Sequence, residues 1–401
     1  MNKLDTLIKI RKAFILLGIG LIISVNTWGR NFYFSTTSGD DSRSTTQAQS
    51  PSTPWKTISK LNSFFGSLLP GDSILFKRGE VFYGSIVVNK SGTASQPIVI
   101  GAYGTGVKPV ITGFTNLTNW TSIGGGIYQS EITNCTPPLN IVKINGKNTP
   151  IGRYPNSGVL NFETHSGLTS ITDNQLSGTP NWTGAEVVIR KNRYTLARYP
   201  ITNHTNATLT YPGTGEMPFD NFGYFIQNDI KTLDVFSEWY LNPSTNRLQV
   251  YFGTSVPASQ SVKVSTVDTL LNCFYQSYVT INNLDFEGAN IFALYVKGGQ
   301  NVTVLSCGID FVGKTGIYAG TTNFKIENCN INHCNQRALL SGSPNTIIRN
   351  NIIKNSGMIP GMSDLGGSYV GIDIVGGDST LIEYNELDSI GAHGIFVRGN
   401  N

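Results

Sequence analysis

Charged side chains are scarce in this chain of 401 residues, at 13%, whereas glycine alone supplies 44 positions. This composition disfavours a cytosolic α/β enzyme and favours a β-rich exported protein. Strong positive charge is also missing, since the formal net charge is +4. Residues 1–29 hold four basic residues and one acidic residue, so their removal lowers the net charge to about +1. We therefore expect no nucleic-acid partner.

The N-terminus carries a short apolar run from Ala13 to Val25, preceded by basic residues and followed by small ones. The run is too short for a comfortable membrane span and has the features of a secretory signal. We interpret residues 1–29 as a signal peptide. The mature chain is then expected to have no membrane span and to be secreted, periplasmic or on the cell surface.

Cysteine is rare, at five residues, and no cysteine stands at metal-ligand spacing from one of the four histidines. The sequence therefore predicts no metal site of this kind. Pairing of Cys307 with Cys329 is disfavoured, because neighbours on stacked strands give poor disulfide geometry. We expect mostly buried free thiols.

A repeat fills the C-terminal part of the chain. Its aligned apolar anchors are 23, 22, 22 and 34 residues apart and are Ile281, Val304, Ile326, Ile348 and Ile382. A period near 22 is typical of a solenoid. Each unit holds a second short apolar strand and no helix-length stretch, which excludes helical repeats. A leucine-rich repeat is excluded because its leucine signature is missing. The sequence thus predicts an all-β fold, a right-handed parallel β-helix with one unit per coil.

A second column of residues lies three positions after the anchors. Its members are Leu284, Cys307, Cys329, Asn351 and Asn385. Stacked coils would place like residues about 4.8 Å apart, so Asn351 and Asn385 predict an internal asparagine ladder. The two cysteines are interpreted as small buried apolar residues.

The rest of the chain divides by pattern. Residues 53–68 predict an amphipathic helix that begins at Pro54 after the capping residue Thr53 and covers the open end of the solenoid. We expect the N-terminal cap and first coils in residues 30–113, a β-rich insertion in residues 114–261, and regular coils in residues 262–401. The last strand lies close to Asn401, and we expect further coils beyond it.

Several motifs resemble secreted bacterial β-helix proteins of the pectate-lyase-like superfamily. They are PWKTI (54–58), PGDSILFKRG (70–79), AYGTG (102–106), ING (144–146), GRYPN (152–156) and EWYL (238–241). The resemblance implies the β-helix architecture over nearly the whole mature chain. For the reaction it implies no single type, because the fold hosts lyases, hydrolases and non-enzymes. AHGI (392–395) also resembles a cleft strand of polygalacturonases, and this resemblance implies that the strand with His393 faces a cleft.

The outward positions of the second strands gather candidate functional residues on one face. Aromatic residues suited to stacking on sugars are Tyr295, Tyr318 and Phe396, and the charged or titratable residues are Asp373, His393, Arg337, Lys297 and Arg398. We assign Asp373, His393 and Arg337 as candidate catalytic residues and the others as candidates for substrate binding. The alternative is that the insertion covers this row as ordinary core.

The loop in residues 357–368 is longer than its equivalents by about 12 residues, by comparison of the repeat lengths. It either walls a groove over Asp373 and Tyr318 or is an insertion without consequence. Its Asp364 is a further candidate for substrate binding. Glu287 and Asp310 form a separate carboxylate pair on adjacent coils, interpreted as a solvated face rather than a calcium site.

The function expected from these features is binding, and cleavage, of an extracellular polysaccharide by a monomer. Hydrolysis is the reaction that we favour. It requires two carboxyl groups, and Asp373 is the one carboxylate in these outward columns. The alternatives are a lyase acting on a uronate glycan, which would call for calcium as cofactor, and a non-catalytic surface or adhesive β-helix.

Overall fold

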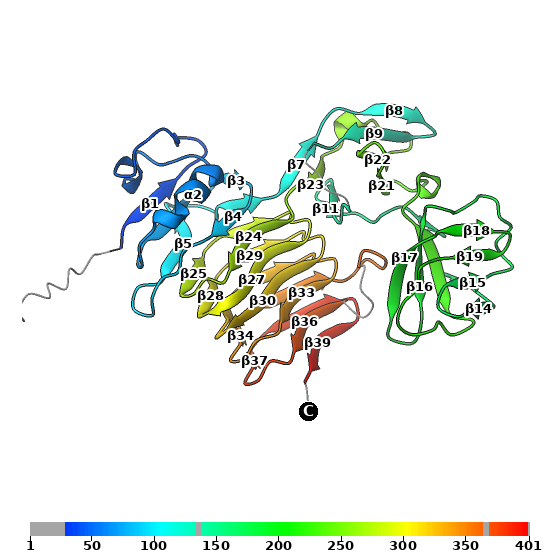
Figure 1. Cartoon of the computed structure of the whole chain (residues 1–401). Helices are drawn as coiled ribbons and strands as arrows, with labels where there is room; N and C mark the ends of the chain where they lie inside the picture. Colours follow the sequence, from blue (N-terminus) through cyan, green and yellow to red (C-terminus); the bar gives the residue numbers. More distant parts are fainter. Residues whose placement is uncertain (1–28, 134–137, 364–368, 400–401) are drawn as a thin grey trace, which may run out of the picture.

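The computed structural model describes residues 29–133, 138–363 and 369–399. Three parallel sheets form the body of the molecule, and successive coils stack along them (Figure 1). We call them sheets I, II and III.

Sheet I has the order β1 (Asn31–Phe34), β2 (Ser73–Lys77), β5 (Ile98–Tyr103), β25 (Val279–Asn282), β28 (Val302–Leu305), β31 (Lys325–Glu327), β34 (Ile347–Arg349) and β37 (Leu381–Glu383). Sheet II has the order β4 (Ile86–Val88), β24 (Thr269–Phe274), β27 (Phe292–Gln300), β30 (Thr315–Thr322), β33 (Arg337–Ser341), β36 (Val370–Val375) and β39 (His393–Arg398). Sheet III has the order β3 (Val81–Tyr83), β6 (Val110–Thr112), β26 (Asp285–Glu287), β29 (Gly308–Asp310), β32 (Asn330–Asn332), β35 (Ile352–Ser356) and β38 (Glu386–Ile390).

From β2 onward the chain visits the sheets in the constant order I, III, II, and one such circuit is one coil. Tight corners connect the strands, and the same kind of backbone recurs there. Left-handed residues precede the inward position after sheet I in each regular coil, and they are Asn283, Ser306, Asn328, Asn350 and Tyr384. Asparagine is frequent at these corners because its short polar side chain tolerates this conformation.

The predicted anchor column is confirmed. Ile281 pairs with Val304, and the register continues through the remaining anchors Ile326, Ile348 and Ile382. The first four have no exposed surface, and Ile382 packs against the same core. The periodic apolar positions of the sequence are therefore the positions that are buried inside the coils.

The predicted asparagine ladder is also present. Asn351 Oδ1 accepts a hydrogen bond from Cys329 N at 2.9 Å, and Asn385 Oδ1 accepts one from Asn351 N at 3.0 Å. Asn351 Nδ2 in turn donates to Ile326 O at 3.2 Å. These bonds satisfy backbone groups that would otherwise be buried without partners. Within the described residues, the cysteines are buried free thiols (Cys273, Cys307, Cys329 and Cys334).

The N-terminal helix is shorter than predicted. Helix α2 spans Ile58–Phe64, and the Thr57 side chain caps it by accepting a hydrogen bond from Lys60 N at 3.1 Å. The predicted start at Thr53 and Pro54 is wrong, because Trp55 is drawn into a β-bridge with Phe34 and is therefore extended. A short 3-10 helix, η2 (Phe65–Ser67), directly follows α2. Three others are η1 (Gln47–Gln49), η3 (Ile230–Thr232) and η4 (Pro257–Ser259).

Between β6 and β24 the chain leaves the coils and forms four antiparallel sheets around two separate cores. The proximal module, with Trp239 in its core, contains β7 (Phe114–Leu117), β8 (Thr121–Gly124), β9 (Ile127–Glu131), β10 (Val142–Ile144), β11 (Lys147–Asn148), β21 (Trp239–Asn242), β22 (Arg247–Tyr251) and β23 (Val262–Ser265). The distal module, with Trp182 in its core, contains β12 (Arg153–Tyr154), β13 (Leu160–Asn161), β14 (Thr164–Ser166), β15 (Ser170–Thr172), β16 (Glu186–Arg190), β17 (Leu196–Pro200), β18 (Asn203–Thr205), β19 (Thr208–Thr210) and β20 (Gly223–Gln227).

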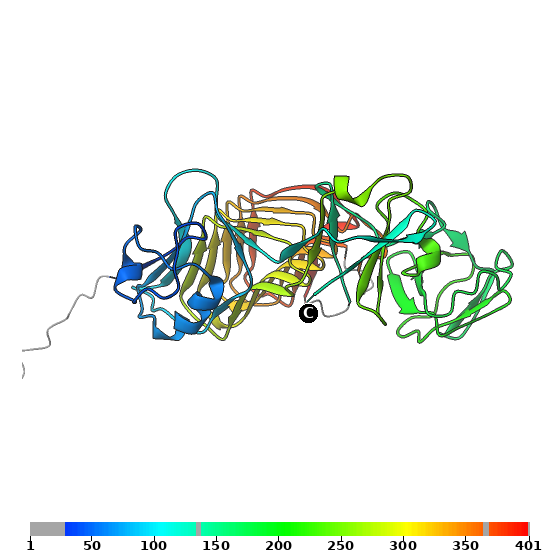
Figure 2. The same cartoon turned by 90° about the horizontal axis from the view of Figure 1, so that it is seen from above.

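These two modules make up the insertion, and they stand to one side of the coils in both views (Figure 1, Figure 2). Strand β23 pairs with β7 rather than with a coil, so the antiparallel part continues to Ser265. The insertion leaves from the corner between sheets III and II, where it contacts later coils. Asn140 N donates to Asn290 Oδ1 at 2.8 Å, and Lys143 forms an ion pair with Glu287. The corner next to sheet II is therefore where the insertion meets the coils.

Candidate functional site

Sheet II presents the candidate residues in the predicted columns. Tyr295 pairs with Tyr318, and the same outward column continues through Leu340, Asp373 and Phe396. A neighbouring column carries Arg337, Val370 and His393 in register. The hydrogen bond from Arg337 to Asp373 and the stacking of His393 on Phe396 show that the two columns lie on the same outer face of sheet II. We call this surface the sheet II face.

Asp373 is the electrostatic centre of this face. It has no exposed surface, and its Oδ2 atom accepts hydrogen bonds from Arg337 Nε at 2.7 Å and Arg398 Nη2 at 2.6 Å. Its Oδ1 atom accepts a longer one from Arg398 Nε at 3.3 Å. Both oxygens are thus engaged, and the carboxylate orients two guanidinium groups. Charged hydrogen bonds of this kind fix side-chain geometry strongly.

His393 stacks on Phe396 with ring centroids 5.0 Å apart, and the Arg398 guanidinium carbon lies 5.3 Å from the centre of the same ring. Within the described residues, the buried Nδ1 atom of His393 has no hydrogen-bond partner. His393 therefore places a buried ring nitrogen, without a protein partner among the described residues, beside the arginine pair.

Tyr295 and Tyr318 stack on each other, with centroids 4.9 Å apart and planes 23° apart. Both are half-buried, and Phe292 packs against each of them. A Cβ atom at Gly320 would lie 2.9 Å from the Tyr318 ring, so this glycine leaves the space into which the ring settles. Lys297, two residues after Tyr295 on β27, is exposed. The rings form a continuous aromatic strip rather than separate platforms.

A cleft of about 690 Å³ opens at the corner where the insertion faces the coils. From the coils it is lined by Gly357, Met358, Pro360, Tyr369, Ile390, Gly391 and Ala392, and from the distal module by residues that include Arg153, Arg190, Arg193, Tyr194 and Phe222. Ala392 directly precedes His393 at the start of β39. The cleft thus reaches the chain just before β39, and no described residue of the sheet II face lines it.

The long loop forms one wall of this cleft. Met362 is buried in the core of the proximal module, and Gly361 O accepts a hydrogen bond from Gln227 Nε2 at 2.9 Å. Gly361 N donates to the Tyr369 hydroxyl at 2.9 Å. The described part of the loop therefore ties the coils to the insertion. Asp364 lies outside the described residues, and neither Asp373 nor Tyr318 lines the cleft.

The sequence did not reveal the cleft's basic and aromatic residues as a site. Arg153 belongs to the GRYPN motif, and residues 190–194 read RKNRY, which combines three basic side chains with a tyrosine. That clustering is the signal available beforehand. Burial lowers the pKa of Arg153 from its ordinary value, and its guanidinium carbon lies 3.8 Å from the centre of the Phe225 ring.

The separate pair Glu287 and Asp310 is occupied by protein partners. Glu287 forms its ion pair with Lys143, and Asp310 Oδ1 lies 2.8 Å from His333 Nδ1. In the ranges that the structure describes, no group of three or more histidine, cysteine, aspartate or glutamate side chains is arranged to hold a metal ion. Both carboxylates of the pair therefore have a basic side chain as a partner.

Comparison with known proteins identifies the architecture. Residues 270–401 match the family model described as "Right handed beta helix region". The fold is a right-handed parallel β-helix. A solved structure titled "Glycoside hydrolase" superposes with a TM-score of 0.73 and 14% identity, covering 92% of this chain and 79% of its own. The structure of XylC in complex with xylose superposes with a TM-score of 0.60 and 14% identity, covering 91% of this chain and 60% of its own.

A sequence relative is the lacto-N-biosidase of Bifidobacterium longum subsp. longum, which is 38% identical over 87 residues. This match covers 21% of the present chain and 5% of the relative. The chain therefore spans a small part of that relative's length. Among the described residues no helix has the length and apolar character needed to cross a membrane.

Proposed function

We propose that this β-helix is an exported carbohydrate-active enzyme that binds and cleaves a polysaccharide, with glycoside hydrolysis as the reaction. The observation that carries the proposal is the sheet II face, where the tyrosine strip of Tyr295 and Tyr318 runs toward Asp373 and His393. A row of aromatic rings offers apolar surface to sugars, and the charged cluster beyond it offers chemistry.

Within this face we assign Tyr295, Tyr318, Phe396 and Lys297 to substrate binding. We assign His393 to proton exchange, because its imidazole stacks on Phe396 beside the Arg398 guanidinium. Asp373 and Arg337 are assigned to the reacting end of the face together with Arg398. The buried Asp373 carboxylate acts there by holding both guanidinium groups toward the substrate.

The local match to a lacto-N-biosidase supports hydrolysis as the first reaction. The paired arginines favour the second candidate, a lyase on a uronate glycan, because guanidinium groups neutralise a substrate carboxylate. Calcium is the candidate cofactor of that reaction, although the described residues include no group of three or more histidine, cysteine, aspartate or glutamate side chains arranged to hold it. A non-catalytic binding protein would use the tyrosine strip alone.

The location and partners belong to the same proposal. We place the mature protein outside the cytoplasm, as a monomer whose partner is a polysaccharide rather than nucleic acid. The short apolar N-terminal run that suggests export lies outside the described residues.

A glycan panel tests the reaction. The full chain is incubated with neutral and uronate polysaccharides, while reducing ends and ultraviolet absorbance are followed with and without a calcium chelator. Hydrolysis gives new reducing ends without absorbance, whereas a lyase gives absorbing products. If no polysaccharide yields either signal or binds, the proposed function is wrong.

Two variants locate the site. Tyr318→Ala should weaken glycan binding by about 1 to 2 kcal/mol, the scale of losing one buried aromatic contact. The matched control is Tyr384→Ala, because Tyr384 is 80% exposed and lies next to sheet I. Asp373→Asn should lower turnover by orders of magnitude and leave binding nearly intact. If both variants behave like the control, the sheet II face is not the site.

A further inference from the structure

The distal module carries a second cavity, of about 1030 Å³, which adjoins the cleft. It is lined by Leu168, Asn192, Arg193, Tyr194, Gly215, Glu216, Met217, Phe219 and Phe222. Arg193, Tyr194 and Phe222 line both spaces. The two cavities therefore adjoin at these three residues, and we call them together the track.

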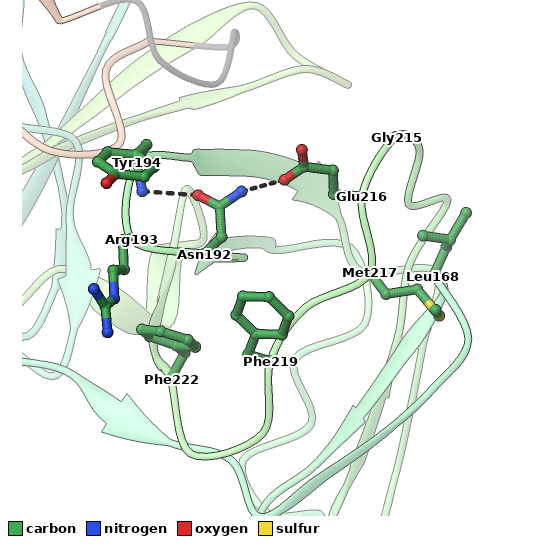
Figure 3. Close-up of a pocket in the computed structure, with 9 residues that line it drawn as sticks. All are labelled: Leu168, Asn192, Arg193, Tyr194, Gly215, Glu216, Met217, Phe219 and Phe222. Atoms are coloured by element: carbon green, nitrogen blue, oxygen red, sulfur yellow. Dashed lines mark hydrogen bonds between the residues drawn. The ribbon is translucent and has the colours of Figure 1, made fainter.

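Large apolar side chains stand open to solvent along this track. Tyr194 is 76% exposed, Phe219 57% and Met217 56%. Phe219 and Phe222 lie side by side across the cavity from Asn192, with ring centroids 5.7 Å apart (Figure 3). A cluster of exposed aromatic rings inside a concavity is the usual mark of a binding surface rather than of a folding core.

The loop that carries this surface is held in place. Asn192 Oδ1 accepts hydrogen bonds from Tyr194 N and Thr195 N, each at 2.7 Å, and its Nδ2 atom donates to Glu216 (Figure 3). The neighbouring Lys191 is 1% exposed, and its Nζ atom donates to the Tyr199 hydroxyl at 3.2 Å. The aromatic surface is thus preorganised, which reduces the entropy lost when a ligand binds.

The charge of the cleft is positive. Arg153, Arg190 and Arg193 line the cleft, and its described lining residues include no aspartate or glutamate. The adjoining cavity also holds Glu216, whose carboxylate accepts a hydrogen bond from the Asn192 amide and keeps its negative charge, so the excess of positive charge lies in the cleft. Within the part of the chain that the structure describes, the exposed Arg193 guanidinium has no hydrogen bond or ion pair. An anionic group would find an unoccupied counter-charge there.

We propose that this track is a glycan-holding site for sugars bearing a carboxylate or sulfate group, with Arg193 as the anion-binding residue and Tyr194, Phe219 and Phe222 as the sugar-packing surface. Guanidinium groups bind planar carboxylates in a bidentate manner, and aromatic rings pack on the apolar faces of sugars. Carboxylate-bearing sugars fit the guanidinium fork better than sulfated ones.

The site deepens the proposed function and rests on it. The track reaches Ile390, Gly391 and Ala392, directly before His393 on β39. A chain held on the distal module would therefore extend toward the sheet II face. The insertion would thus select acidic glycans and present them to the coils.

The test measures binding of three defined oligosaccharides to the full chain by calorimetry: an oligogalacturonate, a sulfated galactan fragment and a neutral xylo-oligosaccharide. Replacing Arg193 by Gln should raise the Kd of the oligogalacturonate about tenfold, as expected for loss of a charged hydrogen bond. The sulfated fragment should lose less, and the neutral one should be unaffected. Phe219→Ala should weaken binding of both acidic sugars.

The matched control is Lys147→Gln, which removes one positive charge from an exposed position of the insertion that lines neither cavity. An equal loss in this control would show unspecific attraction and overturn the site. The site is also overturned if the wild-type chain binds no acidic sugar, or if R193Q binds it unchanged. In either case, continued binding or cleavage of a neutral glycan would leave the proposed function standing. Absence of all glycan binding and cleavage would end both.

Discussion

Asp373 and Arg337 are 36 residues apart in sequence, yet Arg337 Nε donates a 2.7 Å hydrogen bond to Asp373 Oδ2 from the adjacent coil. The carboxylate has no exposed surface, and the guanidinium side chain is 10% exposed. Charges in this position require their partner, because water cannot replace it. Removal of one partner alone should therefore weaken the stacking of β33 on β36 as well as change the sheet II face.

Asp373→Ala should consequently destabilise the protein by about 3 kcal/mol, the scale for breaking a buried ion pair. Chemical unfolding followed by tryptophan fluorescence gives the change. Lys354→Gln breaks the exposed pair with Glu386 and serves as the control, with little expected effect. Equal stability of D373A and the wild type would show that the arginines are solvated without their partner.

Asn351→Leu tests the internal ladder. Leucine occupies the equivalent position at Leu284, so its size is tolerated in this column. The buried Cys329 N–H would nevertheless lose its acceptor, at a cost of about 1 to 3 kcal/mol. Urea unfolding measures the loss, with the half-buried Asn332→Ala as control. A variant as stable as the wild type would mean that the ladder contributes no net stability.

His204 gives the distal module a dependence on pH. Burial lowers the pKa of its imidazole below the ordinary 6.5, although the hydrogen bond to Asn206 O opposes this shift. The unfolded chain therefore takes up the proton first, and stability falls as pH drops below about 6.5 toward the folded value. The Nδ1 atom accepts from Trp182 N at 3.1 Å, a role it loses when protonated.

His204→Asn keeps an acceptor near the Nδ1 position and removes the titration. Melting temperatures at pH 7.5 and 5.5 should thus differ less in this variant than in the wild type. An identical pH dependence in both proteins would assign the effect to other groups.

Met362→Ala should loosen the tie between loop and insertion. The side chain is 1% exposed in the proximal core, and truncation of a buried methionine costs about 2 to 5 kcal/mol. Limited proteolysis should cut the loop and the insertion faster than in the wild type. Met358→Ala, at a side chain that is 49% exposed, should leave the cleavage rate unchanged; equal protection of M362A would show that other contacts hold the loop.

The coils could be predicted from sequence because each one must bury apolar side chains and satisfy backbone groups at the same positions. Ile281 and Val304 must both face one interior, and Asn351 must satisfy the backbone of the next coil, so periodicity carries the information. The columns of Tyr318 and Asp373 follow from the same register. Helix α2 began later than predicted, because the bridge between Trp55 and Phe34 outweighed the local signal of Pro54.

The cleft could not be predicted in this way. Arg193 and Ile390 line one cavity, but their proximity depends on how the insertion docks, and no repeat encodes that. The ion pair of Asp373 with Arg398 could not be predicted either. Periodicity predicts which residues align in a column, but it does not predict which contacts a long side chain makes with a neighbouring column. Site chemistry outside the repeat therefore needed the tertiary structure.

The attachment of Gly361 and Met362 to the insertion has a mechanical consequence. An ordinary solenoid contacts only its nearest neighbours and can unravel coil by coil. Here the insertion departs after β6, and the loop between β35 and β36 returns to it, so a brace spans several intervening turns. Those turns should open together rather than singly, and amide hydrogen exchange in β27, β30 and β33 should report one shared protection energy.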